Sequence, residues 1–146
     1  MGKINFVQDN ESMSIVRGDA AGCISSVRRT RRVTGALCEG TVLDVAVDIR
    51  KGSPTYGQHV AVELTEENHR QFFVPRGFAH GFAVLSETAI FQYKCDNFYH
   101  PEADGGISIL DDSLGIDWRI PTEQAILSEK DTKHPLLKDF DSPFEF

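Results

Sequence analysis

The feature that most constrains the fold is a regular series of short, strand-like segments between residues 41 and 95. The first of them, Thr41–Ile49, alternates along its length and predicts a strand whose apolar face carries Leu43, Val45, Val47 and Ile49. Further strands are expected at Val60–Leu64, Gln71–Val74, Phe78–Leu85 and Thr88–Cys95, with turn-forming residues between them. Strands at this spacing predict an all-β fold, an antiparallel sandwich or barrel.

The tail from Asp111 to Phe146 has a different character. It carries Trp118 among scattered apolar residues and several turn formers. A short helix is expected near Thr122–Leu127, and Asp139–Phe146 is expected at the surface. The chain has no internal repeat or linker, and its 146 residues suit one hydrophobic core, so a single domain over residues 1–146 is predicted.

Charge and composition disfavour two classes of partner. The net charge is −7 and the pI is about 5.1, which argues against nucleic acid. A dense basic run, Arg28–Arg32, has no interleaved aromatic residues and fits a solvated face better than a nucleic-acid site. No stretch approaches the roughly 18 to 20 apolar residues of a membrane span, and Met1–Phe6 lacks the apolar core expected of a signal peptide. Three cysteines without metal spacing, Cys23, Cys38 and Cys95, predict free thiols in a reducing cytoplasm.

The residues with the most chemical promise are His80 and Tyr93. If residues 80–85 and 88–93 form a hairpin that turns at Ser86-Glu87, His80 lies opposite Tyr93 on one face. Their neighbours on that face are Phe82, Val84, Ala89 and Phe91, all apolar. In such surroundings a tyrosine hydroxyl can donate a proton and a histidine can act as acid, base or hydrogen-bond donor. An ordinary core histidine bonded to a core tyrosine fits the same spacing, and the spacing alone favours it.

Carboxylates and metals give weaker signals. Asp131 could orient a histidine by accepting its ring N–H, although a loop aspartate that caps a turn is the commoner case. Asp44 and Asp48 lie on the face opposite Val45, so solvent exposure is expected for both. A metal centre needs several converging ligands, and the five histidines show neither an H-x-H nor an H-E-x-x-H arrangement.

Several segments together resemble one protein family. They are Phe6–Asn10, Asp44–Gly57, Val74–Phe82, Tyr93–Asp96, Pro101-Glu102, Leu114–Trp118 and Leu127–Asp131. In their residues and in their order along the chain, these segments resemble the dTDP-4-dehydrorhamnose 3,5-epimerase family. The resemblance is almost continuous from residue 41 to 138.

The resemblance implies a cupin jelly roll that forms homodimers, needs no metal or redox cofactor and works in dTDP-rhamnose and surface polysaccharide biosynthesis. Members move protons at C3 and C5, beside the C4 ketone of a dTDP-4-keto-6-deoxy sugar. By carry-over, Tyr93 is the proton donor, His80 a substrate ligand, and Asp131 the residue that orients the base. Substrate contacts are implied for Gln8, Asn10, Asp104 and Lys130, of which Asp104 stands where many members have Glu.

Two departures from the family pattern stand out. Members carry more residues before the segment that matches Phe6–Asn10, so the chain is expected to be truncated at its start. Over residues 12–39 the residues typical of the family are missing. By residue count, the histidine that serves as base in the family corresponds to Cys23, an arginine to a position near Ala20 and a lysine to a position near Val33. Codons for Gly22–Ser26 can read Leu-His-Phe-Gln in a neighbouring frame, and those for Thr34–Gly40 can read Leu-Val-Arg-Phe-Ala-Arg. We therefore hypothesise compensating frameshifts, and we expect an irregular or poorly packed segment there.

The missing base separates family membership from turnover. Without it, proton abstraction loses at least the ~10²–10⁴-fold that a general base supplies, so little or no activity is expected. The alternatives are an epimerase acting at one carbon only, a ketoisomerase of a dTDP-sugar, a nucleotide-sugar-binding cupin or degenerate paralogue without catalysis, and a metal cupin.

Overall fold

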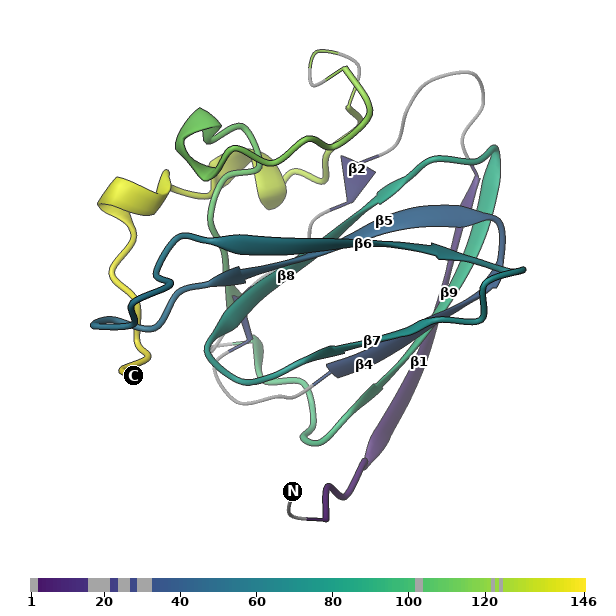
Figure 1. The fold of residues 1–146 in the computed structure, drawn as a ribbon, viewed down its shortest axis with the longest axis horizontal. Helices are drawn as coiled ribbons and strands as arrows, with labels where there is room; N and C mark the ends of the chain where they lie inside the picture. Colours follow the sequence, from purple (N-terminus) through teal and green to yellow (C-terminus); the bar gives the residue numbers. More distant parts are fainter. Residues whose placement is uncertain are drawn as a thin grey trace.

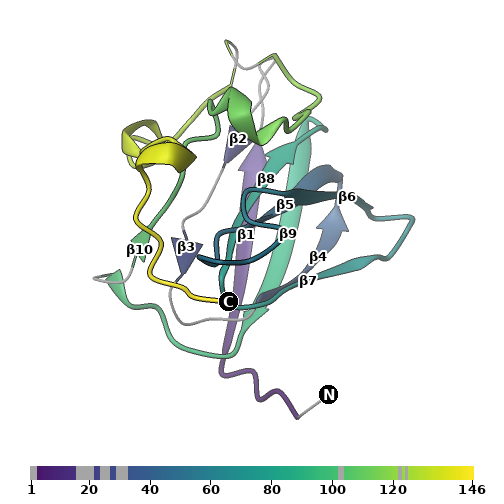
Figure 2. The same ribbon diagram turned by 60° about the vertical axis from the view of Figure 1, so that its left-hand side comes forward.

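The computed structural model describes residues 3–15, 22–23, 27–28, 33–101, 104–121, 123 and 125–146. Two four-stranded antiparallel sheets face each other (Figure 1), and a small two-stranded sheet lies beside them (Figure 2). Sheet A has the order β1-β9-β4-β7, with β1 at Gln8–Ile15, β9 at Thr88–Cys95, β4 at Val33–Glu39 and β7 at Gln71–Val74. Sheet B has the order β2-β8-β5-β6, with β2 at Gly22–Cys23, β8 at Phe78–Val84, β5 at Thr41–Asp48 and β6 at His59–Thr65. The small sheet pairs β10 (Asp104–Gly105) with β3 (Val27–Arg28). The all-β prediction and the strands expected between residues 41 and 95 are confirmed.

Strand β5 is buried on both faces, which the sequence pattern did not reveal. Its odd-numbered side chains pack against the tail, and the core cluster there contains Leu43, Val45, Val47, Ile49, Ile107, Ile109, Leu114 and Trp118. Its even-numbered side chains face sheet A, in the space between the sheets. The expected exposure of Asp44 and Asp48 is therefore wrong, since they are 0% and 1% exposed. An alternating strand is half-exposed only when one face meets water, and here a second layer covers the outer face.

The C-terminal segment supplies that second layer. It runs along one side of the barrel past β3 and β10, seen in green to yellow in Figure 2. Its regular parts are short 3₁₀ turns: η2 (Asp112–Leu114), η4 (Asp131–Lys133) and η5 (Leu137–Asp139). The helix expected near Thr122–Leu127 falls partly outside the described residues, and 125–127 are not helical. Exposure at the end is mixed, because Ser142 is buried and its hydroxyl donates to the carbonyl of Ile49.

The predicted pairing of residues 80–85 with 88–93 is wrong. Strand β8 pairs with β5 and β2 in sheet B, whereas β9 pairs with β1 and β4 in sheet A. The turn at Ser86-Glu87 therefore carries the chain from one sheet to the other. A crossover and a hairpin need the same short turn, so local sequence does not distinguish them.

Residues 12–39 are more regular than expected wherever the structure describes them. Ser12–Ile15 continue β1, and Val33–Glu39 form β4 between β9 and β7, with a register shift between Leu37 and Glu39. Gly35 fits this place because a Cβ there would lie 2.5 Å from Cζ of Phe91. Most of Arg28–Arg32 and residues 24–26 lie outside the described residues, whereas Gly22-Cys23 and Thr34–Gly40 are described. Nothing in the structure tests the frameshift, which stays a hypothesis.

Two expectations concern the thiols and the membrane. Cys95 is a buried free cysteine, as predicted, while the side chains of Cys23 and Cys38 lie outside the described residues. Across the part of the chain that the structure describes, no helix has the length and apolar character needed to cross a bilayer.

Candidate active site

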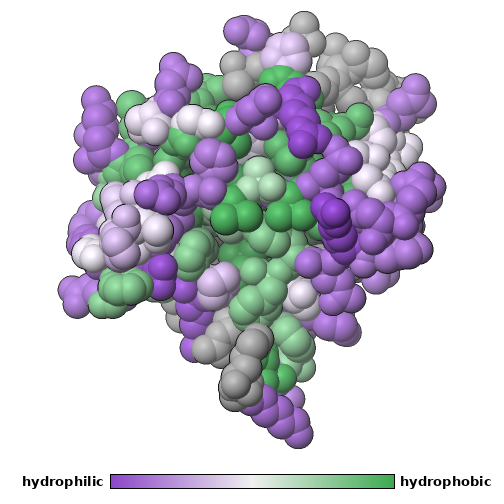
Figure 3. All heavy atoms as spheres, viewed as in Figure 1, coloured by the Kyte–Doolittle hydropathy of each residue, from purple (hydrophilic) through white to green (hydrophobic). Residues whose placement is uncertain are grey.

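The space between the two sheets, called the chamber below, is lined by apolar side chains and has polar groups at its edges. Its lining joins Val42, Leu64, Phe82 and Val84 of sheet B to Ala89 and Phe91 of sheet A. The rings of Phe82 and Phe91 meet across it with centroids 4.9 Å apart. The edges of β6 and β7 do not pair with each other, and apolar side chains gather between them with hydrophilic ones around (Figure 3).

His80 projects into this chamber from β8. It lies opposite Ala46 of β5, whereas Asp44 lies opposite Phe82, so His80 and Asp44 are diagonal neighbours on the inner face. Their side chains meet, with Nε2 of His80 2.6 Å from Oδ1 of Asp44. The imidazole is 13% exposed and the carboxylate 0%. Asp44 is the functional candidate that sequence reasoning missed; the available signal was an acid within a strand that is apolar on both sides.

Tyr93 projects into the chamber from the opposite sheet. It follows Phe91 on the inner face of β9, with ring centroids 6.0 Å apart, and packs against the apolar lining. Asn10 of β1 and Gly35 of β4 are its cross-strand neighbours. The imidazole and the phenol thus both face the space between the sheets, although they come from facing sheets rather than from one hairpin, and their shared role in catalysis stays a prediction.

Strand β1 gives the chamber a polar wall. Its inward side chains are Gln8, Asn10, Ser12 and Ser14, and its outward ones are exposed. Nε2 of Gln8 donates to Oδ1 of Asn10 at 2.9 Å, and Nδ2 of Asn10 lies 3.8 Å from Sγ of Cys95. Both predicted substrate contacts on this strand thus face the chamber.

The remaining predicted residues belong to the C-terminal half. Asp131 is buried at the start of η4, where Oγ of Ser128 donates to Oδ2 at 2.5 Å. Its other oxygen lies 3.5 Å from Nε2 of His134, so it does have a histidine partner, though not His80. Lys130 is exposed, and the side chain of Asp104 lies outside the described residues.

The structure describes two of the positions at which this chain lacks the residue expected from the family resemblance. The backbone of Cys23 pairs with Phe82, which puts position 23 beside the chamber, while its side chain lies outside the described residues. Val33 is buried in an apolar cluster with Ala46, Val74 and Cys95. The chamber is therefore apolar at the position where the resemblance implies a lysine.

An ionic network surrounds Asp48 at the end of β5. Asp48 accepts hydrogen bonds from Nε and Nη2 of Arg50 at 2.9 and 2.7 Å, and from the hydroxyls of Ser53 and Thr55 at 2.6 Å each. These bonds, that of the Arg50 guanidinium first, hold the pKa of Asp48 well below its ordinary value, against the opposing effect of burial. The guanidinium carbon also lies 4.8 Å from the ring centroids of both Phe78 and Phe146. Asp48 thus has a structural partner and is not available for proton transfer.

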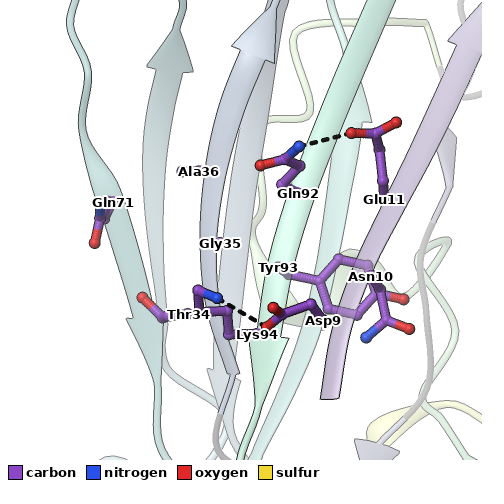
Figure 4. Close-up of a pocket in the computed structure, with 10 residues that line it drawn as sticks. All are labelled: Asp9, Asn10, Glu11, Thr34, Gly35, Ala36, Gln71, Gln92, Tyr93 and Lys94. Atoms are coloured by element: carbon purple, nitrogen blue, oxygen red, sulfur yellow. Dashed lines mark hydrogen bonds and ion pairs between the residues drawn. The ribbon is translucent and has the colours of Figure 1, made fainter. Parts of the chain in front are cut away.

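A separate hollow of about 420 Å³ lies on the outer face of sheet A (Figure 4). Most of its side chains point away from the chamber, including Gln92, which donates to Glu11 at 2.6 Å, and Lys94, which bonds Asp9 at 2.8 Å. The other residues of its wall are Asn10, Thr34, Gly35, Ala36, Gln71 and Tyr93. Among the described residues, no group of three or more His, Cys, Asp or Glu could hold a metal ion.

Comparisons with known proteins agree on one family. The family model described as dTDP-4-dehydrorhamnose 3,5-epimerase matches residues 1–139. A dTDP-4-dehydrorhamnose 3,5-epimerase of Methanothermobacter thermautotrophicus is 46% identical over 138 residues, which cover 94% of this chain and 74% of that protein. The Salmonella typhimurium protein of the same name is 46% identical over 141 residues, 92% of this chain and 73% of its own. The crystal structure of a Legionella pneumophila dTDP-6-deoxy-D-glucose-3,5-epimerase, in complex with dTDP-4-keto-L-rhamnose, is 50% identical with a TM-score of 0.84, over 94% of this chain and 72% of that one.

Proposed function

Because the chain belongs to the dTDP-4-dehydrorhamnose 3,5-epimerase family, we propose that it binds a dTDP-4-keto-6-deoxy sugar between its sheets and transfers protons beside the C4 ketone. It would act in dTDP-rhamnose and surface polysaccharide biosynthesis, in the cytoplasm. The observation that carries this proposal is the placement of His80 and Tyr93 in one chamber on facing strands.

The chemistry of the chamber suits an epimerisation. A ketone acidifies its neighbouring C–H bonds, and an N–H donor near the carbonyl oxygen stabilises the enolate that forms. Inversion requires that a proton leaves from one face of the sugar and returns to the other. A phenol and an imidazole on opposite walls can serve the two faces, and we assign the returning proton to Tyr93. Gln8 and Asn10 supply amide groups for the sugar along β1.

The rate should be low, because position 23 holds a cysteine where the family resemblance places the base. General-base catalysis contributes ~10²–10⁴-fold, and the chain should fall short of its relatives by up to that factor. Slow proton exchange with intact ligand binding is the expected behaviour.

Solvent exchange tests this proposal. The protein is incubated with dTDP-4-keto-6-deoxyglucose in D₂O, and NMR follows deuterium at C3 and C5 and the stereochemistry of the product, while calorimetry measures binding. Saturable binding with slow deuterium uptake supports the proposal. Tyr93→Phe should reduce inversion more than exchange, since its loss affects the returning proton. Binding without any exchange would instead favour a nucleotide-sugar-binding cupin, and no binding would refute the proposal.

A homodimer is also proposed, through the outer face of sheet A. Met13 and Ile15 at the end of β1 are 62% and 63% exposed there, which is costly for an isolated chain. Sedimentation should give twice the mass of one chain, and Met13→Lys with Ile15→Lys should give the single mass. A wild-type chain that sediments as a monomer at high concentration contradicts the dimer and leaves the activity proposal untouched.

A further inference from the structure

The Asp44–His80 pair is the best-formed acid–base unit inside the chamber. Asp44 is fully buried, and its Oδ1 engages Nε2 of His80 at 2.6 Å. Its second oxygen, Oδ2, is buried and has no hydrogen-bond partner among the described residues. A buried carboxylate is expensive unless it accepts a hydrogen bond, and the ring N–H of His80 is the donor that satisfies it.

This contact determines which nitrogen of His80 can react. A carboxylate accepts the Nε2–H both when the imidazole is neutral and when it is charged. The proton that the ring gains or loses is therefore the one on Nδ1. Within the described residues Nδ1 makes no hydrogen bond. In the neutral ring it presents a lone pair to a ligand in the chamber.

We propose that His80, oriented by Asp44, is the proton-accepting residue of this chain. The inference rests on the proposed function, and it makes Asp44 a positioning residue. It also changes the role that the family resemblance gives to His80, which is that of a substrate ligand. The arrangement corresponds to the carboxylate and histidine of hydrolase triads, where a buried aspartate fixes the tautomer and stabilises the imidazolium that forms.

The proton-transfer step balances without any further reactant. The lone pair on Nδ1 takes a proton from a carbon beside the C4 ketone, and the C–H electron pair forms a C=C bond. The ketone π electrons move to oxygen, which becomes an enolate. Return of a proton from the imidazolium gives exchange with retention, and return from Tyr93 on the other wall gives inversion.

The second Asp–His pair is less suitable for this role. One oxygen of Asp131 accepts from Ser128 at 2.5 Å, and the other lies 3.5 Å from His134, beyond a normal hydrogen bond. His134 packs against Gly106 in the C-terminal segment, where a Cβ on the glycine would lie 2.6 Å from Nε2. The position that Asp131 would serve, residue 23, carries no imidazole.

Deuterium exchange in four variants tests the proposal. Asp44→Asn keeps the shape of the side chain but can donate to Nε2, which forces the proton of the neutral ring onto Nδ1 and removes the base. We expect exchange to fall by ~10²–10⁴-fold with sugar binding retained. His80→Gln should lose exchange to the same extent. Asp111→Asn is the matched control, a buried aspartate outside the chamber, with a change of no more than about twofold.

The fourth variant, Asp131→Asn, distinguishes the two carboxylates. The proposal is overturned if Asp131→Asn loses more exchange than Asp44→Asn does. It is also overturned if Asp44→Asn and His80→Gln exchange protons at the wild-type rate. In both cases the proposed function stands. Failure of the wild-type chain to bind the sugar would refute the proposed function itself. Thermal melts and dTDP affinity establish that each variant is folded.

A spectroscopic measurement separates positioning from mere support of the fold. Nitrogen-15 NMR of the histidine ring should show a protonated Nε2 and an unprotonated Nδ1 in the neutral wild-type ring. In Asp44→Asn the two assignments should exchange. An unchanged tautomer would contradict the role given to Asp44.

Discussion

The buried aspartates of strand β5 differ from those of the C-terminal segment in the kind of partner they have. Asp44 and Asp48 each have an ionisable or cationic side-chain partner, an imidazole and a guanidinium, and Asp48 also accepts from nearby hydroxyls and a backbone N–H. Asp111 and Asp131 are satisfied mainly by hydroxyls and backbone N–H groups nearby: Asp111 accepts from Ser113 and from the backbone of Leu137, and Asp131 from Ser128.

The difference follows from the local backbone. A turn folds its own N–H groups and hydroxyls toward an aspartate, so the acid is satisfied locally. An extended strand has its backbone groups committed to neighbouring strands, so an inward acid needs a side-chain partner. Removing a partner should therefore cost more on β5 than in the tail.

The largest effect on stability is expected for His80→Leu. It leaves the buried Asp44 with neither oxygen paired, and the free energy of unfolding should fall by about 3–5 kcal/mol. Urea denaturation at neutral pH measures this loss. A loss below that of the tail variants described below would show that the two regions do not differ.

Asp48→Asn is expected to come second, with a loss of about 2–3 kcal/mol, because it weakens several charge-assisted hydrogen bonds to Arg50. The lowered pKa of Asp48 gives this loss a definite pH dependence. A lowered folded-state pKa contributes stability that is complete above the ordinary value of 3.8 and disappears as the pH falls below it. The gap between wild type and variant should be equal at neutral and mildly acidic pH, and smaller near pH 3. A gap that grows in acid would contradict the assignment.

Asp111→Asn should have a smaller effect, about 1 kcal/mol. Burial acts to raise the pKa of Asp111, but the bonds from Ser113 and Leu137 outweigh it and lower the pKa overall. The asparagine keeps an acceptor for these donors, which limits the loss. Thermal unfolding is a sufficient measurement, and a cost as large as that of Asp48→Asn would remove the distinction between strand and turn.

The smallest effect is expected for His134→Leu, about 0.5 kcal/mol, because its contact with Asp131 is long and Ser128 remains. It is the counterpart, in the tail, of His80→Leu on β8. Because both variants replace the histidine of an Asp–His pair by leucine, the ratio of their losses in unfolding free energy measures directly how far the two regions differ.

The sequence predicted the strands and the chamber well, but not the way in which the strands connect. The alternation of side-chain character in Thr41–Ile49 and the turn-forming residues between strands are local properties. Both can therefore be recognised in the sequence. Whether the chain at Ser86-Glu87 folds back on itself or crosses to a second sheet depends on distant partners. His80 and Tyr93 reached the same chamber in either case, because both lie on the inward set of their strands.

The burial of Asp44 could not be predicted for a related reason. The outer face of β5 is covered by Ile107, Ile109 and Trp118, which lie far along the chain. Asp44 lies on the opposite, even-numbered face, which is buried against sheet A. The dependence of Asp44 on a long-range partner is also why its pairing with His80 had no signature in the local sequence.

The arrangement of sheet A has a consequence for how the protein is made. Among the described residues, strand β1 pairs only with β9, so Gln8–Ile15 lack this partner until Thr88–Cys95 have left the ribosome. At ~5–20 residues per second the wait lasts several seconds. During that time an edge strand with Met13 and Ile15 on its outer side remains open to other nascent chains. Expression at lower temperature or with chaperones should thus raise the yield of native protein more than any change to its finished surface.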